Sequence, residues 1–151
     1  MADHIDKRLR NAATTLLTGL TTTGARVYKS RAYPMQDADL PGLRIYVDDS
    51  EIQDIAFGGG AATTRQERAI ELKVEFCGKA TVNYDDQADA SKKEVEQAIA
   101  GDLTLGAVVK TAQLRRIETE REGEGEKVVI VTRMVFVCTG YTARNAPDIS
   151  L

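Results

Sequence analysis

The stretch that most constrains the fold of this chain is Lys127–Tyr141, because it reads as a strand that is apolar on both of its faces. Successive side chains of a strand point to opposite sides of the sheet. One side carries Val128, Ile130, Met134, Phe136 and Cys138, and the other carries Val129, Val131, Val135, Val137 and Tyr141. A strand with one wet face alternates apolar and polar residues, so we expect both faces here to be covered. Either the chain's own helices or a neighbouring subunit would cover them.

Length and charge favour a single globular domain and argue against a nucleic-acid-binding or membrane-spanning protein. A chain of 151 residues is expected to form one domain with a substantial core. Its formal net charge of -3 provides no basic field for DNA phosphates, which argues against strong nucleic-acid binding. No apolar run reaches the roughly 18 residues of a membrane helix. The charged N-terminus lacks a signal-peptide core, so the protein is expected in a cytoplasm.

Apolar periodicity predicts an α+β fold in which two main helices pack on an antiparallel or mixed sheet. The helices are expected at Asp3–Leu20, capped by Asp3, and at Asp85–Asp102. A loop is expected at Met35–Pro41 and a turn at Asp49-Ser50. The expected strands are Val27–Tyr33, Leu43–Val47, Glu51–Phe57, Arg68–Cys77 and Gln113–Arg121, with a Gly-rich turn at Glu122–Glu126 leading into Lys127–Tyr141. The expected domain is 1–142, followed by a polar tail at 143–151.

The sequence contains no pattern that predicts catalysis, a cofactor or a metal. His4 is the only histidine and is expected on the surface, which leaves no base for a Ser-His-Asp or Cys-His arrangement and too few ligands for zinc. Cys77 and Cys138 are expected to be reduced core thiols. The acidic clusters Asp48-Asp49-Glu51 and Asp85-Asp86 lack calcium-loop spacing and are interpreted as turns and caps. We therefore predict that the protein is not an enzyme.

A Gly-rich segment, Gly58-Gly59-Gly60, has the composition of a phosphate-binding loop but not its pattern. Thr63 and Thr64 stand where Gly-Lys-Ser/Thr would be required. Consecutive glycines are costly to order, so we expect the segment Glu51–Gln66, which contains this loop, to be mobile in the free protein and ordered in an assembly.

An alternating acidic run precedes the last strand. Its members are Glu118, Glu120, Glu122, Glu124 and Glu126, relieved by Arg121. Two interpretations remain open at this point. The run is a solvated hairpin tip, or it is a negatively charged rim that repels DNA and lets it slide.

In their order, the segments resemble the tail terminator proteins of long-tailed phages with non-contractile tails, the minor tail protein U family. The resemblance covers nearly the whole chain and rests on order and size rather than on one diagnostic motif. The matching segments are the N-terminal helix, Val27-Tyr28 with Arg31-Ala32-Tyr33-Pro34, Asp39–Val47, Ile70–Glu75, Asp85–Asp89, and Val135–Thr142.

This resemblance implies a ring-forming α+β domain that acts as a structural protein of a bacteriophage virion. Six copies would cap the tail tube at its neck-proximal end, stop polymerisation and offer the head-joining surface. The implied partners are the chain itself, the major tail tube protein and a head–tail connector, with DNA passing through unbound. The candidate interaction residues are Gly58, Gly59, Gly60, Glu118, Glu120, Glu122, Glu124, Val129, Val131, Val135 and Val137. Another phage neck or head-completion protein, and a small non-viral accessory domain, remain alternatives.

Overall fold

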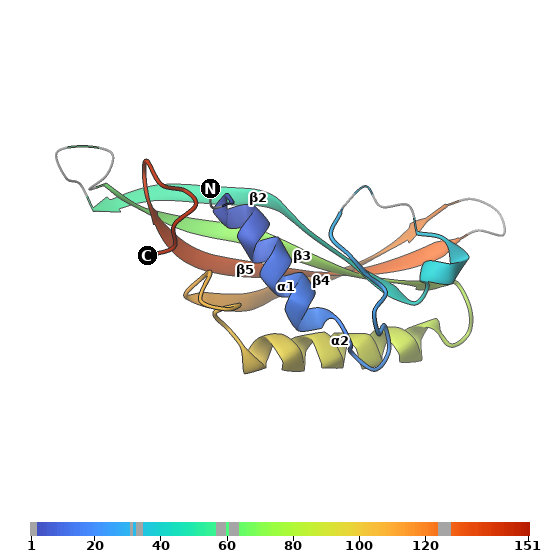
Figure 1. The fold of residues 1–151 in the computed structure, drawn as a ribbon. Helices are drawn as coiled ribbons and strands as arrows, with labels where there is room; N and C mark the ends of the chain where they lie inside the picture. The colour runs from blue at the N-terminus through green and yellow to red at the C-terminus, as the bar shows by residue number, and fades with distance from the viewer. Residues whose placement is uncertain (1–2, 31, 33–34, 57–59, 61–63, 124–127) are drawn as a thin grey trace.

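The chain folds into a five-stranded mixed sheet with two α-helices packed on one of its faces (Figure 1). The computed structural model describes residues 3–30, 32, 35–56, 60, 64–123 and 128–151. Its elements are α1 (Ile5–Leu17), β1 (Val27–Tyr28), the 3-10 helix η1 (Asp37–Asp39), β2 (Gly42–Ala56), β3 (Arg65–Lys79), α2 (Tyr84–Gly101), β4 (Thr111–Glu122) and β5 (Val129–Ala143). The strands lie in the order β1-β2-β3-β5-β4. The predicted α+β class is therefore confirmed.

Both predicted helices are present, with shifted ends. The cap of α1 is His4 rather than Asp3, because His4 Nδ1 accepts a hydrogen bond from the backbone N–H of Asp6. The helix ends at Leu17, and Gly19 follows in the left-handed region with φ 94°. Helix α2 begins one residue earlier than predicted, at Tyr84.

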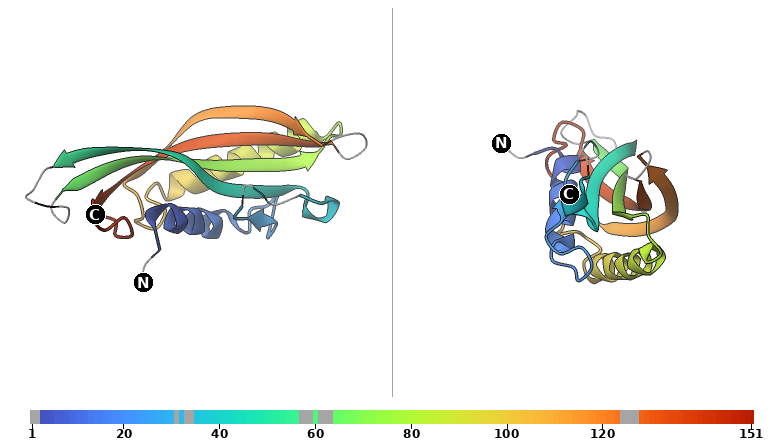
Figure 2. Two further views of the ribbon diagram at one scale, coloured as in Figure 1. Left: turned by 90° about the horizontal axis from the view of Figure 1, so that it is seen from above. Right: turned by 90° about the vertical axis from the view of Figure 1, so that its right-hand side faces the viewer.

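The predicted turn at Asp49-Ser50 is wrong, because β2 runs straight through it. Val47 pairs with Leu72 and Ser50 pairs with Ile70, so the ladder shifts register there without ending. A bulge absorbs the extra residue and lets the strand continue. The resulting β2–β3 hairpin extends past the helices at one end of the molecule (Figure 2).

Two further expectations need correction. The extended segment predicted at Val27–Tyr33 is a two-residue strand, β1, which pairs in parallel with β2. Lys29, Ser30 and Ala32 belong to no strand, and Arg31 and Tyr33 lie outside the described part of the chain. The predicted loop Met35–Pro41 contains η1, in which Gln36 and Asp39 cap each other.

The core lies between the helices and one face of the sheet. Helix α1 contributes Ile5, Leu9, Ala13 and Leu17, and α2 contributes Ala88, Val95 and Ile99. The sheet contributes Leu43, Ile45, Ile70, Leu72, Val74, Phe76, Met134, Phe136 and Cys138. Burial of this apolar face is the main stabilising term. Within the described residues, no helix is long and apolar enough to cross a membrane.

The C-terminal segment returns to the body of the domain. The carbonyl oxygen of Pro147 accepts from the Ile5 N–H at 2.9 Å, and Arg8 donates to the carbonyl of Asp148 at 2.7 Å. The Leu151 N–H donates to the Tyr141 carbonyl at 2.8 Å. These contacts join residues 144–151 to the start of α1 and to the end of β5.

Candidate assembly surface on the charged face of the sheet

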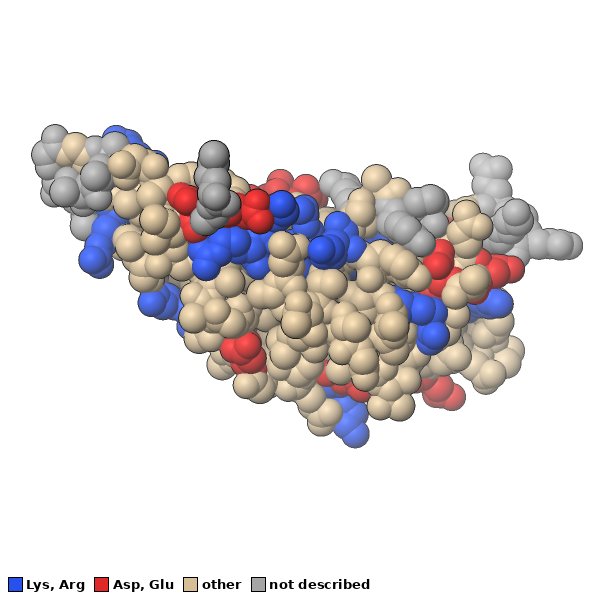
Figure 3. Space-filling model, viewed as in Figure 1, with Lys and Arg blue, Asp and Glu red and all other residues tan. Residues whose placement is uncertain are grey.

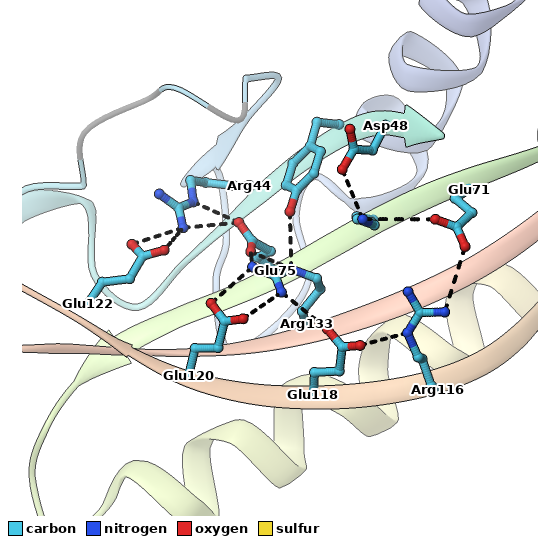
Figure 4. A network of polar contacts seen from close by, with 11 residues as sticks. Arg44, Asp48, Glu71, Glu75, Arg116, Glu118, Glu120, Glu122 and Arg133 are labelled. Atoms are coloured by element: carbon cyan, nitrogen blue, oxygen red, sulfur yellow. Dashed lines mark hydrogen bonds and ion pairs between the residues drawn. The ribbon is translucent and has the colours of Figure 1, made fainter. Parts of the chain in front are cut away.

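The sheet face opposite the helices carries a network of charged side chains from four strands (Figure 4). We name it the charged face. Alternation along each strand places these residues on the same face of the sheet. The network contains four cations and six carboxylates: Arg44, Lys73, Arg116, Arg133, Asp48, Glu71, Glu75, Glu118, Glu120 and Glu122.

Arg133 lies at the centre of the charged face. Its guanidinium contacts Glu75 on β3 at 2.7 Å and, on β4, Glu118 at 3.2 Å and Glu120 at 3.0 Å. Its Nε also donates to the hydroxyl oxygen of Tyr46 on β2 at 3.1 Å. One side chain thus joins four strands. The charge-assisted bonds that Arg133 donates to Glu120 and Glu75 raise the pKa of Arg133.

Glu75 is the most deeply buried charge of the network, with 1% of its surface exposed. Arg44 approaches it from β2 at 3.0 Å, opposite to Arg133. Arg44 also reaches Glu122 on β4 at 3.1 Å. A buried carboxylate is tolerated only when cations and hydrogen bonds compensate its lost hydration, and here two guanidinium groups do so.

A second group of ion pairs continues along the same face. Lys73 contacts Asp48 at 3.0 Å and Glu71 at 3.9 Å. Arg116 contacts Glu71 at 3.6 Å and Glu118 at 2.6 Å. The bond from Arg116 is the largest cause of a lowered pKa at Glu118, and the bond from Arg133 lowers the pKa of Glu120. Both glutamates are therefore ionised at neutral pH.

The valines on the second side of β5 are covered in a way that sequence reasoning did not foresee. Val131 and Val135 are 1% and 0% exposed, although no helix of the described part of the chain lies on this face. Val135 pairs with Lys73 on one side and with Arg116 on the other. The alkyl stems of such side chains cover apolar surface while their charged ends stay in contact with water. Val129 and Val137 remain half-buried at this face.

The other candidate residues are distributed as follows. Glu118, Glu120 and Glu122 lie together on β4, whereas Glu124 lies outside the described residues. Gly60 is exposed, and Gly58 and Gly59 also lie outside them. Sequence reasoning missed Arg44, Glu75 and Arg133. The available signal was a charge at every second position of β3, but its partners come from strands that are distant in sequence.

His4, Cys77 and Cys138, for which no catalytic role is predicted, occupy the following positions. His4 is exposed, as predicted, and acts as a helix cap. Cys77 and Cys138 are free and buried, as predicted, and burial raises the pKa of each thiol to about 12. They lie on opposite faces of the sheet. No group of three metal-ligating side chains occurs within the described residues.

Comparison with known proteins gives a sparse result. No protein-family model matches this chain, and no curated protein matches it. Among solved structures, the chain is similar to a chain of the virion of a native gene transfer agent particle. The TM-score is 0.42 at 14% sequence identity, and the match covers 90% of this chain and 91% of that chain. A likeness of this degree carries no argument about function.

Proposed function

We propose that this chain is a structural protein of a bacteriophage virion, the tail terminator of a long tail with a non-contractile tube. Six copies form a ring that caps the tube at its neck-proximal end, stops its polymerisation and provides the surface for head joining. Its partners are other copies of itself, the major tail tube protein and a head–tail connector protein. DNA passes through the ring without specific binding, and the chain carries out no chemical reaction.

The observation that carries this proposal is the far end of the β2–β3 hairpin. Ile52 is 51% exposed and Ile55 is 44% exposed, on a hairpin that extends past the helices (Figures 1 and 2). Exposed aliphatic side chains on a projecting element are characteristic of a surface that is covered in an assembly. A subunit of a ring gains such cover from its neighbour or from the tube.

The order of elements supports the same proposal. The resemblance to tail terminators rests on a helix, a long hairpin, an acidic helix and a closing hairpin in that order, and α1, β2–β3, α2 and β4–β5 follow it. A closed ring also requires only one heterologous contact, repeated in every copy. The sequence predicts four valines of β5 as candidates for that contact. Val131 and Val135 are buried within the subunit, so Val129 and Val137 are the members that remain accessible.

Electron microscopy with the major tail tube protein of the same phage tests the proposal. Tubes assembled with this protein should end in a six-fold ring, and tubes assembled without it should grow to uncontrolled lengths. Rings bound to the head portal but absent from tube ends would identify a head-completion protein instead. A monomer that binds neither structure would favour a small accessory domain.

A paired variant makes this test specific for the hairpin. Ile52→Ser with Ile55→Ser should weaken capping while the subunit stays folded, because both side chains are exposed. Val82→Ser is the matched control, since Val82 is 96% exposed and precedes α2. Equal capping by both variants would show that the hairpin is not a contact surface.

A further inference from the structure

Helix α1 carries cations that have no carboxylate partner among the described residues. Arg8 donates instead to the carbonyl of Asp148 and to the Ser150 hydroxyl. Arg10 has a buried Nε with no hydrogen-bond partner. Lys29, just after β1, donates to the amide oxygen of Asn11 at 3.4 Å. Arg8 and Arg10 flank Leu9 on opposite sides of the helix, whereas Lys29 contacts Asn11, the residue after Arg10. We therefore name Arg10 and Lys29 the basic patch.

Helix α2 carries the opposite charge. Asp85, Asp89, Lys92 and Glu96 recur at steps of four and three residues and so share one stripe of the helix. Lys92 neutralises Asp89 at 2.8 Å. Asp85 and Glu96 are exposed and make no ion pair with any described residue. We name Asp85 and Glu96 the acidic stripe.

The helix dipole accounts for the position of Asp85 but not for that of Glu96. Asp85 lies in the first turn of α2, where a carboxylate is favoured by the partial positive charge of the helix N-terminus. Glu96 lies three turns further on, beyond the range of that effect. A surface carboxylate without a local partner gains most from a cation supplied by another molecule.

The two charged surfaces lie toward different edges of the sheet. Helix α1 packs mainly on β2 and also touches β1, β3 and α2, whereas α2 packs mainly on β3 and also touches β5. In the strand order, β1 and β2 occupy one side and β5 the other. Figure 3 shows several Lys and Arg side chains around α1, with Asp and Glu also near its start, and separate Asp and Glu side chains along α2 below it. Two complementary patches at different places match the requirement for a head-to-tail contact, in which one copy offers the first patch and its neighbour the second.

We propose that the basic patch of one subunit docks on the acidic stripe of the next subunit in the ring. This inference rests on the proposed function, because it assigns the charged part of the contact between ring neighbours. Charge complementarity of this kind fixes the register of a contact and suppresses wrong orientations. It therefore complements the apolar hairpin, which would supply buried area. The alternative occupant of the basic patch is DNA phosphate, which is treated below as an outcome of the test.

Zero-length cross-linking tests the contact directly. A carbodiimide joins an amine to a carboxylate that touches it, so assembled caps should yield a bond between Lys29 and Asp85 or Glu96. An equal mixture of unlabelled and nitrogen-15-labelled protein distinguishes the bonds between copies from those within one copy. Mass spectrometry should find the Lys29 cross-link in mixed-isotope form.

Charge-reversal variants test the same contact quantitatively, through the efficiency of tube capping. Arg10→Glu with Lys29→Glu reverses the basic patch, and Asp85→Lys with Glu96→Lys reverses the acidic stripe. Each variant alone should lose capping by at least about ten-fold, since like charges placed together cost several kcal/mol. An equal mixture of the two variants should restore capping, because alternating copies again oppose unlike charges at every contact. Lys110→Glu is the control: Lys110 is exposed and pairs with no described carboxylate.

The outcomes separate this inference from the proposed function. Normal six-fold caps from both reversed variants would overturn the docking contact and leave the tail terminator proposal intact. Failure of the wild-type protein to form rings on tubes would overturn the tail terminator proposal itself. Binding of a duplex DNA fragment that is lost only in the Arg10→Glu, Lys29→Glu variant would assign the patch to phosphate and overturn the contact. Restored capping in the mixture, with the mixed-isotope cross-link, supports it.

Discussion

Arg133 on β5 and Glu75 on β3 form an ion pair of 2.7 Å at a position where Glu75 has 1% of its surface exposed. The pair stands directly across the ladder, since the two residues are register partners. Arg44 completes the compensation of Glu75 from the neighbouring strand. On the charged face, paired charged side chains therefore bury part of the sheet, a role that the two helices have on the opposite face.

Removing the carboxylate of this group should strongly destabilise the domain. Glu75→Ala leaves Arg44 and Arg133 without their shared partner in a buried position, and breaking a buried pair in this way costs about 3 to 5 kcal/mol. Urea unfolding followed by circular dichroism should show this as a lower midpoint at unchanged slope. Glu51→Ala serves as the control, because Glu51 is exposed and forms no ion pair with described residues. Equal midpoints for the two variants would mean that the buried pair contributes nothing to stability.

Acid should weaken the charged face. Hydrogen bonds from Arg116 and Arg133 lower the pKa of Glu118, and those from Arg133 lower the pKa of Glu120. A carboxyl whose folded pKa is depressed stabilises the fold above its unfolded pKa of about 4.3 and loses that contribution as pH falls through the folded value. Stability should therefore decrease below about pH 4. The double variant Glu118→Gln, Glu120→Gln should show a shallower decrease, measured as unfolding midpoints at a series of pH values.

Both thiols should be unreactive in the folded protein. Burial raises the pKa of Cys77 and Cys138 to about 12, so little thiolate is present at pH 8 and the sulfur atoms are out of reach. A thiol-specific chromogenic reagent should release no colour until denaturant is added, and then two equivalents. Val82→Cys adds an exposed thiol as a positive control. Fast reaction of the wild-type protein would show that this part of the sheet opens readily.

Two glycines should respond in opposite ways to alanine. A Cβ at Gly42 would clash with the carbonyl oxygen of Asp39, which is backbone and cannot move aside cheaply. Gly42→Ala should therefore lower the melting temperature. Gly101, at the exposed end of α2, has open space around the added atom, so Gly101→Ala should leave stability unchanged or raise it by up to about 1 kcal/mol. Scanning calorimetry of the two variants compares them directly.

Local patterns predicted the helices and the strand types well, because each depends on a periodicity within one segment. The stripe from Ile5 to Leu17 and the alternation from Ile70 to Phe76 are examples. The bulge after Val47 was not predictable in this way, because a pair of polar residues such as Asp49-Ser50 is equally compatible with a turn and with a bulge. Tertiary pairing with β3 decides between them.

The charged face escaped prediction for a related reason. Glu71, Lys73 and Glu75 alternate with apolar residues, which is typical of a strand with one face in water, and nothing in this pattern indicates that Glu75 is buried. Its burial depends on Arg44 and Arg133, which are 31 and 58 positions away along the chain. Only the strand order β2-β3-β5 brings the three side chains together.

The acidic run on β4 offers the last prediction, because the structure changes what its two interpretations mean. Glu118, Glu120 and Glu122 are not a purely solvated tip, since they bind Arg133 and Arg44. A structural role alone predicts that Glu120→Gln with Glu122→Gln lowers stability and leaves function intact once the protein is folded. The network contains six carboxylates and only four cations, however, so a negative excess remains at this face. We expect that excess to weaken adhesion of DNA phosphates over roughly one Debye length, about 8 Å at physiological salt. Phage assembled with the double variant should therefore join heads normally and eject DNA more slowly.

Arg115→Gln is the control for a charge change on the same strand, because Arg115 is exposed and outside the network. An unchanged ejection rate in the double variant, at a temperature where it is fully folded, would leave the acidic run with a structural role only.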